Sequence, residues 1–169
     1  MDCLTWPAEP ASYVKDAVAV LEQALRLWPQ GELALAFNGG KDCTVLLGLV
    51  LLAEAKRLGR TEAGGTGLTA EETTSFFSSG IKMVYFVEEG CFPQQDAFIV
   101  EAQKRFGFEL VRVGANLKEN TATLVAEHGV RAFVMGTRRT DPYAGAMAVG
   151  ILCAELLSSS CSCGGDTLP

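Results

Sequence analysis

The sequence predicts an α/β fold of three layers, in which helices cover both faces of a mostly parallel sheet. Short apolar segments alternate with longer segments of helical periodicity along most of the chain. The apolar segments are uninterrupted, which is typical of strands buried on both faces of a parallel sheet. The chain has 169 residues, 49% of them hydrophobic, and this is enough for one domain with a sizeable core.

The expected elements follow one another in alternation. A first helix is predicted over 11–28, because its apolar residues recur in steps of three and four. The four apolar segments that predict strands are 33–37, 81–87, 108–113 and 131–135. The segments that predict the helices between them are 44–58, 93–106 and 117–128. Parallel strands joined by helices in this way need right-handed crossovers.

Two segments depart from this alternation. Residues 59–80 are dominated by Gly, Thr, Ser and Glu, and they predict an exposed connection with a short helix near 70–77. Residues 144–157 are apolar and rich in Ala, but about 14 residues are too few to cross a bilayer. We expect this second segment to form a helix that closes the sheet, and the last dozen residues to be disordered.

Composition and charge exclude several classes of function. The formal net charge is −6, whereas a general nucleic-acid or membrane surface needs a basic footprint. The six cysteines form no Cys-x-x-Cys pairs, and the single histidine, His128, makes zinc sites and Ser-His-Asp arrangements poor candidates. The first residues lack the basic and apolar regions of a secretory signal. We therefore expect a cytoplasmic protein with reduced thiols, and leave an organellar location open.

The segment Phe37–Cys43, directly after the first predicted strand, predicts a phosphate-binding loop. Gly39 and Gly40 let the backbone approach a phosphate closely, and the helix that follows adds the positive end of its dipole. Lys41 contributes a mobile cation, and Thr44 a hydroxyl for the same oxygens. On the two glycines alone, a simple tight turn between strand and helix is the alternative.

Two well-known phosphate loops do not fit this segment. A P-loop needs Ser or Thr directly after its Gly-Lys pair, and Asp42 stands there instead. The dinucleotide fingerprint needs three spaced glycines, whereas Gly39 and Gly40 are adjacent. A carboxylate beside a phosphate is unusual, so we expect Asp42 either to cap the helix or to bind Mg²⁺.

The loop resembles a known family. Asn38–Cys43, with the sequence Asn-Gly-Gly-Lys-Asp-Cys, is similar to the loop of the adenine-nucleotide α hydrolases, whose usual form is Ser-Gly-Gly-Lys-Asp-Ser. Phe-Asn before the glycines and Cys at the end are typical of one branch, the eukaryotic-type FAD synthetases. The segment Gly136–Tyr143 resembles the Gly-x-Arg-Arg-Thr-Asp-Pro motif of the same branch, and Cys91–Pro93 also fits its pattern.

The resemblance covers Gly31–Tyr143, which is 113 of the 169 residues. It implies a Rossmann-like nucleotide-binding domain over 1–143, related to the PAPS reductases, with 59–80 as an exposed insertion and 144–169 as a divergent tail. It also implies that the chain transfers AMP from ATP to FMN, giving FAD and pyrophosphate. The expected ligands are ATP, FMN and Mg²⁺, with no nucleic acid and no membrane.

The resemblance assigns roles to the loop residues. The backbone amides of Gly39–Cys43, together with Lys41 and Thr44, would cradle the leaving pyrophosphate. Asp42 would place Mg²⁺, directly or through water, and Asn38 would hydrogen-bond the reacting phosphates without adding charge.

Further roles fall on the loops after the second and fourth strands. Arg138 and Arg139 would bind phosphate oxygens, and Asp141 would fix these arginines or accept a hydrogen bond from the flavin. Glu88 would face the adenine or the ribose. Asp141 before a proline is also a good helix start, and Glu88 also fits an exposed acidic turn.

Beyond Tyr143 the sequence departs from the family. FAD synthetases continue with a segment rich in Trp and Tyr and with further arginines that help to form the flavin pocket. The change is what a shortened splice product or a gene-model error would produce. It leaves a catalytically silent nucleotide-binding module as one alternative, and a sulfonucleotide reductase-like enzyme as another.

Overall fold

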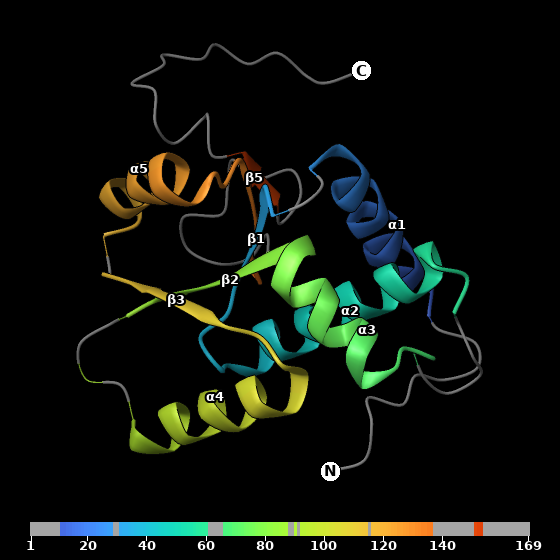
Figure 1. Cartoon of the computed structure of the whole chain (residues 1–169), viewed down its shortest axis with the longest axis horizontal. Coiled ribbons are helices and arrows are strands. Elements are labelled where there is room, and N and C mark those ends of the chain that lie inside the picture. The colour runs from blue at the N-terminus through green and yellow to red at the C-terminus, as the bar shows by residue number, and fades with distance from the viewer. Residues whose placement is uncertain are drawn as a thin grey trace.

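The computed structural model describes residues 11–28, 31–60, 66–87, 90, 92–114, 116–136 and 151–153. Helices and strands alternate along the chain as predicted (Figure 1). The helices are α1 (Ser12–Leu27), α2 (Lys41–Arg57), α3 (Ala70–Ser75), the π-helix η1 (Phe76–Gly80), α4 (Pro93–Phe106) and α5 (Leu117–His128). The strands are β1 (Leu33–Ala36), β2 (Ile81–Phe86), β3 (Leu110–Val113), β4 (Ala132–Val134) and β5 (Ile151–Cys153).

The five strands form one sheet in the order β3-β2-β1-β4-β5. β1 pairs in parallel with both β2 and β4, with Leu33 opposite Ile81 on one side and Ala132 on the other. β3 is parallel to β2, and only β5 is antiparallel. The mostly parallel sheet of the prediction is therefore confirmed, and β1 lies at its centre with the carboxyl ends of β2 and β4 on either side.

The two faces of the sheet are buried under different helices. On one face, Leu33 and Leu35 pack with α1, α2, η1 and α4 in the larger core. On the other face, Ala34 packs with Phe133 and with Leu124 of α5. Neighbouring residues of β1 thus enter opposite cores, as the alternation of side chains along a strand requires. Figure 1 shows α5 on one side of the sheet and α1, α2 and α4 on the other, so the three-layer prediction is confirmed.

Helices α4 and α5 begin and end at residues that suit these positions. Pro93 occupies the first turn of α4, and the helix ends at Gly107, whose φ of +69° is the left-handed conformation that glycine adopts most easily. Asn116 caps α5 by accepting a hydrogen bond from the Glu119 N–H at 3.4 Å, and Gly129 ends it with φ +64°. Both helices have the predicted bounds.

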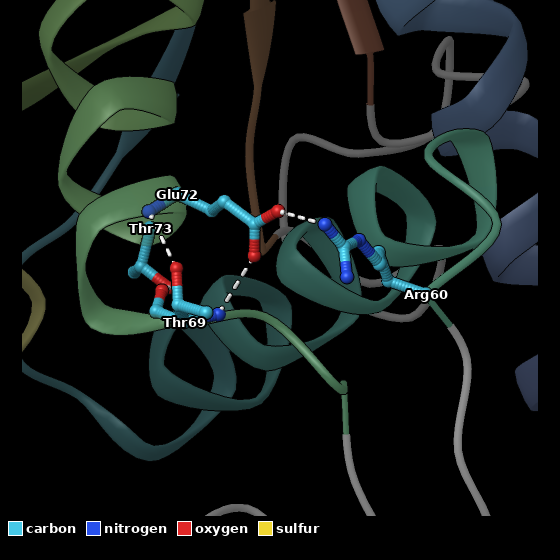
Figure 2. Close-up of polar contacts among 4 residues, drawn as sticks. All are labelled: Arg60, Thr69, Glu72 and Thr73. Carbon is cyan, nitrogen blue, oxygen red and sulfur yellow. Dashed lines mark hydrogen bonds and ion pairs between the residues drawn. The ribbon is translucent and has the colours of Figure 1, made fainter.

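A capping box begins α3. The Thr69 side chain accepts from the Glu72 N–H at 3.1 Å, and the Glu72 carboxylate accepts from the Thr69 N–H at 2.9 Å (Figure 2). Glu72 also lies 3.0 Å from the guanidinium of Arg60, at the end of α2 (Figure 2). The backbone hydrogen bond from Thr69, more than the charge of Arg60, lowers the pKa of Glu72.

Residues 59–80 are only partly the exposed connection that the sequence predicted. The short helix is present, but Phe76 and Phe77 of η1 are buried in the larger core. The ring of Phe77 contacts Phe108 with centroids 5.4 Å apart, and Phe108 in turn contacts Phe37 at 5.6 Å. The mostly polar composition of the segment gave no indication that these two phenylalanines are buried in the core.

The prediction of a helix over 144–157 is wrong for residues 151–153. They form β5, which pairs antiparallel with β4, Phe133 opposite Leu152. Without β5 the edge of β4 would present unpaired backbone groups, and a short strand satisfies them. The rest of that segment, and the last dozen residues for which disorder was expected, lie outside the described residues. No helix in the described part of the chain is both long and apolar enough to cross a membrane.

Candidate nucleotide-binding site

A pocket of about 470 Å³ opens at the carboxyl ends of β1, β2 and β4. This is the position at which open α/β sheets bind ligands. The residues that line it, grouped by the strand they belong to or follow, are Ala36, Phe37, Asn38, Gly40, Lys41, Asp42 and Cys43 after β1, Val84 and Phe86 of β2, and Met135 and Gly136 after β4. Six of the predicted site residues are therefore brought together in one cavity.

The loop between β1 and α2 needs glycine at position 39. Gly39 has φ +76°, a conformation that costs other residues about 1–2 kcal/mol. A Cβ atom at Gly39 would also lie 3.0 Å from Cγ1 of Ile99, on α4. The loop therefore lies directly against α4, with no room for a side chain between them.

The amide of Asn38 closes the loop on itself. Its Oδ1 accepts a hydrogen bond from the Gly40 N–H at 3.0 Å and from the thiol of Cys43 at 2.8 Å. Because both partners are donors, the oxygen faces them and the NH₂ group is on the other side of the amide. Asn38 is exposed and lines the pocket, so this NH₂ group is a neutral donor at the pocket.

Helix α2 begins at Lys41, three residues earlier than the predicted segment. Gly40 is its N-cap and provides no side-chain cap, so the prediction that Asp42 caps the helix is wrong. A glycine cap leaves the first N–H groups of the helix to other acceptors, which is the usual arrangement at anion sites. Asp42 lies in the first turn and is half-buried, and Lys41 is exposed beside it.

The position after β4 is packed tightly against this helix end. A Cβ atom at Gly136 would lie 3.3 Å from the Cys43 backbone nitrogen and 3.4 Å from the carbonyl carbon of Asp42. In the sequence, Gly136 was identified only as the first residue of the arginine motif, and neither Met135 nor Gly136 was predicted to line the pocket. The glycine just before the two arginines was the signal from which a close approach of the backbone could have been predicted.

Gly39 and Thr44 are described but do not line the pocket, and four other predicted residues lie outside the described residues. The hydroxyl of Thr44 donates to the Gly40 carbonyl at 2.8 Å, within its own helix, and its phosphate role stays a prediction. The four that lie outside the described residues are Glu88, Arg138, Arg139 and Asp141. The same holds for Cys91. Among the described residues there is no group of three or more His, Cys, Asp or Glu residues arranged to hold a metal ion.

A second pocket of about 460 Å³ lies at the opposite end of the sheet, where β2 begins. Trp28, Phe76 and the buried carboxylate of Glu54 are among the residues that line it. Both Glu54 oxygens accept from Arg57 at 2.7 Å, and this hydrogen bonding raises the pKa of Arg57. The charge of this carboxylate is therefore already balanced by Arg57 of the same helix. The first pocket, by contrast, lies at the positive end of α2.

Three curated proteins are similar to the chain over most of its length. The chain is 29% identical over 130 residues to a protein of Caenorhabditis elegans described as a probable FAD synthase, covering 76% of this chain. It is 27% identical over 124 residues to the corresponding protein of Schizosaccharomyces pombe, covering 73% of this chain. The chain is thus similar to proteins described as probable FAD synthases. The resemblance predicted from the loop and the arginine motif is thus confirmed, although no family model matches the chain.

Solved structures of FAD synthetases share the fold. The crystal structure of Candida glabrata FMN adenylyltransferase with FAD and inorganic pyrophosphate superimposes with a TM-score of 0.59, at 22% identity over 80% of this chain. The yeast FAD synthetase in complex with FAD covers 82% of this chain at 23% identity, with a TM-score of 0.57.

The chain spans only part of the length of each of these proteins. It spans 22% of the worm protein, 42% of the fission yeast protein and 46% of the Candida chain.

Proposed function

We propose that this chain is an FMN adenylyltransferase, which transfers AMP from ATP to FMN and releases pyrophosphate. The observation that carries the proposal is the glycine loop at the positive end of α2, facing a pocket at the carboxyl ends of the strands. Its similarity to proteins described as FAD synthases supports the choice of substrates. ATP and FMN are the small-molecule partners, and we propose a cytoplasmic location.

In the proposed reaction, a phosphate oxygen of FMN attacks the α-phosphorus of ATP. A new P–O bond forms, the bond between the α-phosphorus and the bridging oxygen breaks, and pyrophosphate carries away the electron pair. The step needs alignment of the reactants and stabilisation of the negative charge on the leaving group. The backbone amides at the start of α2 and the ammonium of Lys41 supply that stabilisation, and the NH₂ group of Asn38 holds the phosphates without adding charge.

Mg²⁺ is the expected metal, and the donor set fits it. Asp42 is the single acidic side chain among the described residues that line the pocket. Mg²⁺ in nucleotide sites is held by one or two carboxylates together with substrate phosphates and water. Asp42 would hold the ion together with the phosphates of ATP, and a bound ion would supply positive charge for the leaving pyrophosphate.

We further propose that the two neighbouring loops complete the site with residues that lie outside the described ones. Arg138 and Arg139 follow Gly136 by only two and three residues, and Gly136 lines the pocket. Two guanidinium groups there would bind phosphate oxygens, with Asp141 orienting them or accepting from the flavin. Glu88, after β2, would face the adenine or the ribose.

A catalytically silent nucleotide-binding module is the second candidate. The glycine loop and its pocket support this candidate as well, because they account for nucleotide binding alone. A sulfonucleotide reductase-like enzyme is disfavoured, because the curated relatives are described as FAD synthases.

One experiment separates these functions. The purified chain is incubated with ATP, FMN and Mg²⁺, and FAD is measured by chromatography, with a reaction lacking FMN as the control. FAD formation that is lost in the Lys41→Met variant supports the enzyme. ATP binding without FAD formation supports the silent module, and absence of both overturns nucleotide binding itself.

A further inference from the structure

Gln95 connects helix α4 to the glycine loop. Its Nε2 donates to the backbone carbonyl oxygen of Asn38 at 2.7 Å, across 57 residues of sequence. Gln95 lies in the first turn of α4, and its own N–H donates to the Phe92 carbonyl at 2.9 Å. The contact therefore joins a well-anchored helix end to the residue directly before Gly39.

The loop has a rigid support at this point. Gly39 lies so close to α4 that a Cβ atom would meet Ile99 at 3.0 Å and Phe98 at 3.4 Å. Ile99 is fully buried, so this part of α4 is fixed in the larger core. Gln95 thus adds a directional hydrogen bond to a surface that already positions the loop backbone.

The hydrogen bond fixes the orientation of one peptide group. In a planar trans peptide, the carbonyl of one residue and the N–H of the next point in opposite directions. Since the Asn38 carbonyl points to Gln95, the N–H of Gly39 points away from it. Glycine is conformationally permissive, so without this bond the peptide is freer to rotate and to present an oxygen where an anion needs a donor.

We propose that Gln95 is a positioning residue that holds the Asn38–Gly39 peptide with its N–H toward bound phosphate. The inference rests on the proposed function, because it assumes that the loop binds the phosphates of ATP. Gln95 does not line the pocket itself. Its effect is therefore confined to the phosphate end of the ligand and passes through the backbone of the loop.

The test is a set of binding titrations with ATP, pyrophosphate and adenosine on the full chain. Gln95→Met removes the donor at similar side-chain length, and we expect ATP and pyrophosphate to bind about three- to tenfold more weakly. Adenosine, which has no phosphate, should bind as tightly as it does to the unmodified chain. Gln94→Met is the matched control, since Gln94 is the exposed neighbour in the same turn.

A second variant keeps the test independent of side-chain packing. Gln95→Glu places a carboxylate, which cannot donate, against the Asn38 carbonyl, and should weaken pyrophosphate binding more than Gln94→Glu, which adds the same charge one residue away. Circular dichroism and thermal unfolding check that each variant is folded.

The outcomes separate this inference from the proposed function. Equal pyrophosphate binding by the unmodified chain and both Gln95 variants overturns the role of Gln95 and leaves the proposed function standing. An equal loss for adenosine and ATP also overturns it, because the effect is then not specific to phosphate. Absence of ATP and pyrophosphate binding in the unmodified chain overturns the proposed function and this inference together.

Discussion

The thiol of Cys43 donates to Oδ1 of Asn38 at 2.8 Å, and also lies 3.2 Å from the carbonyl oxygen of Gly40. Cys43 is buried, at 6% exposure, whereas Asn38 is exposed, so this contact joins the interior to the surface of the loop. The side chains at the two ends of the loop thus form a pair. This hydrogen bond explains why the NH₂ group of the Asn38 amide, and not its oxygen, points away from the loop.

The pair predicts different outcomes for two substitutions of Cys43. Cys43→Ser keeps a hydroxyl that can donate to Asn38, whereas Cys43→Ala removes the donor. The loss of one hydrogen bond corresponds to about 0.5–1.5 kcal/mol. We therefore expect ATP to bind about two- to tenfold more weakly to the alanine variant than to the serine variant, as measured by calorimetric titration. Equal affinities for the two variants would contradict the pairing.

Gly39 can be tested against a glycine with the same backbone conformation. Gly39→Ala adds a methyl group 3.0 Å from Ile99 at φ +76°, whereas Gly129→Ala has φ +64° and no atom within 4 Å. Both variants should lose about 1–2 kcal/mol of unfolding free energy from the left-handed backbone. The clash adds to this loss only at Gly39, and only that variant should also bind ATP more weakly. Denaturant unfolding and titration measure the two effects, and an equal loss of ATP binding in both variants would be inconsistent with the loop's role.

Lys41 is predicted to act on the phosphates and not on stability. Its side chain is exposed at the start of α2, so Lys41→Met should leave the thermal unfolding midpoint nearly unchanged. Hydrogen bonds to charged groups correspond to about 1.5–3 kcal/mol, so ATP affinity should fall by at least tenfold. Lys15→Met, at an exposed position of α1, is the control for loss of one positive charge. A similar drop in the control would point to overall charge as the cause.

The capping box of α3 predicts a dependence of stability on pH. The pKa of Glu72 is lowered in the folded chain, so the ionised carboxylate stabilises the fold above its unfolded pKa, for which 4.5 is the reference value. That contribution is lost as the pH falls through the lower, folded pKa. Compared with the unmodified chain, Glu72→Gln should therefore lose stability at pH 7 and differ less as the solution is acidified.

Thr69→Ala tests the other half of the same box. Removing an N-cap hydroxyl lowers the free energy of unfolding by about 1 kcal/mol. Protonation of Glu72 alone should not account for this loss. Urea unfolding at pH 7 measures it. Thr73→Ala is a useful comparison, because the Thr73 hydroxyl donates to the Thr69 carbonyl at 2.9 Å within the helix and caps nothing (Figure 2).

The sequence was most informative where one residue determines the local backbone. The predicted bounds of α4 agree with the structure, in which Pro93 suits the first helical turn and Gly107 the left-handed end. The predicted start of α2 was three residues too late, because its N-cap is Gly40, which has no side chain that marks a helix start. For the same reason Asp42 was wrongly considered as the cap.

Contacts between distant segments were not predictable from the pattern. Phe76 and Phe77 lie in a stretch rich in Ser, Thr and Glu, and their burial depends on Phe108, which follows about thirty residues later. Gln95 meets Asn38 only because the fold places α4 beneath the loop. The loop residues themselves were predicted because their chemistry is local, whereas the arrangement that supports them is tertiary.

The central claim is that the loop after β1 binds the phosphates of ATP. Titration of isotopically labelled chain with pyrophosphate, followed by NMR at the backbone amides, tests it most directly, since it reports on both pockets described above. We predict saturable shifts centred on the amides of residues 39–43 and of Gly136. Shifts centred on Trp28, Phe76 and Gly80 at the second pocket, or no saturable shifts at all, would contradict the account.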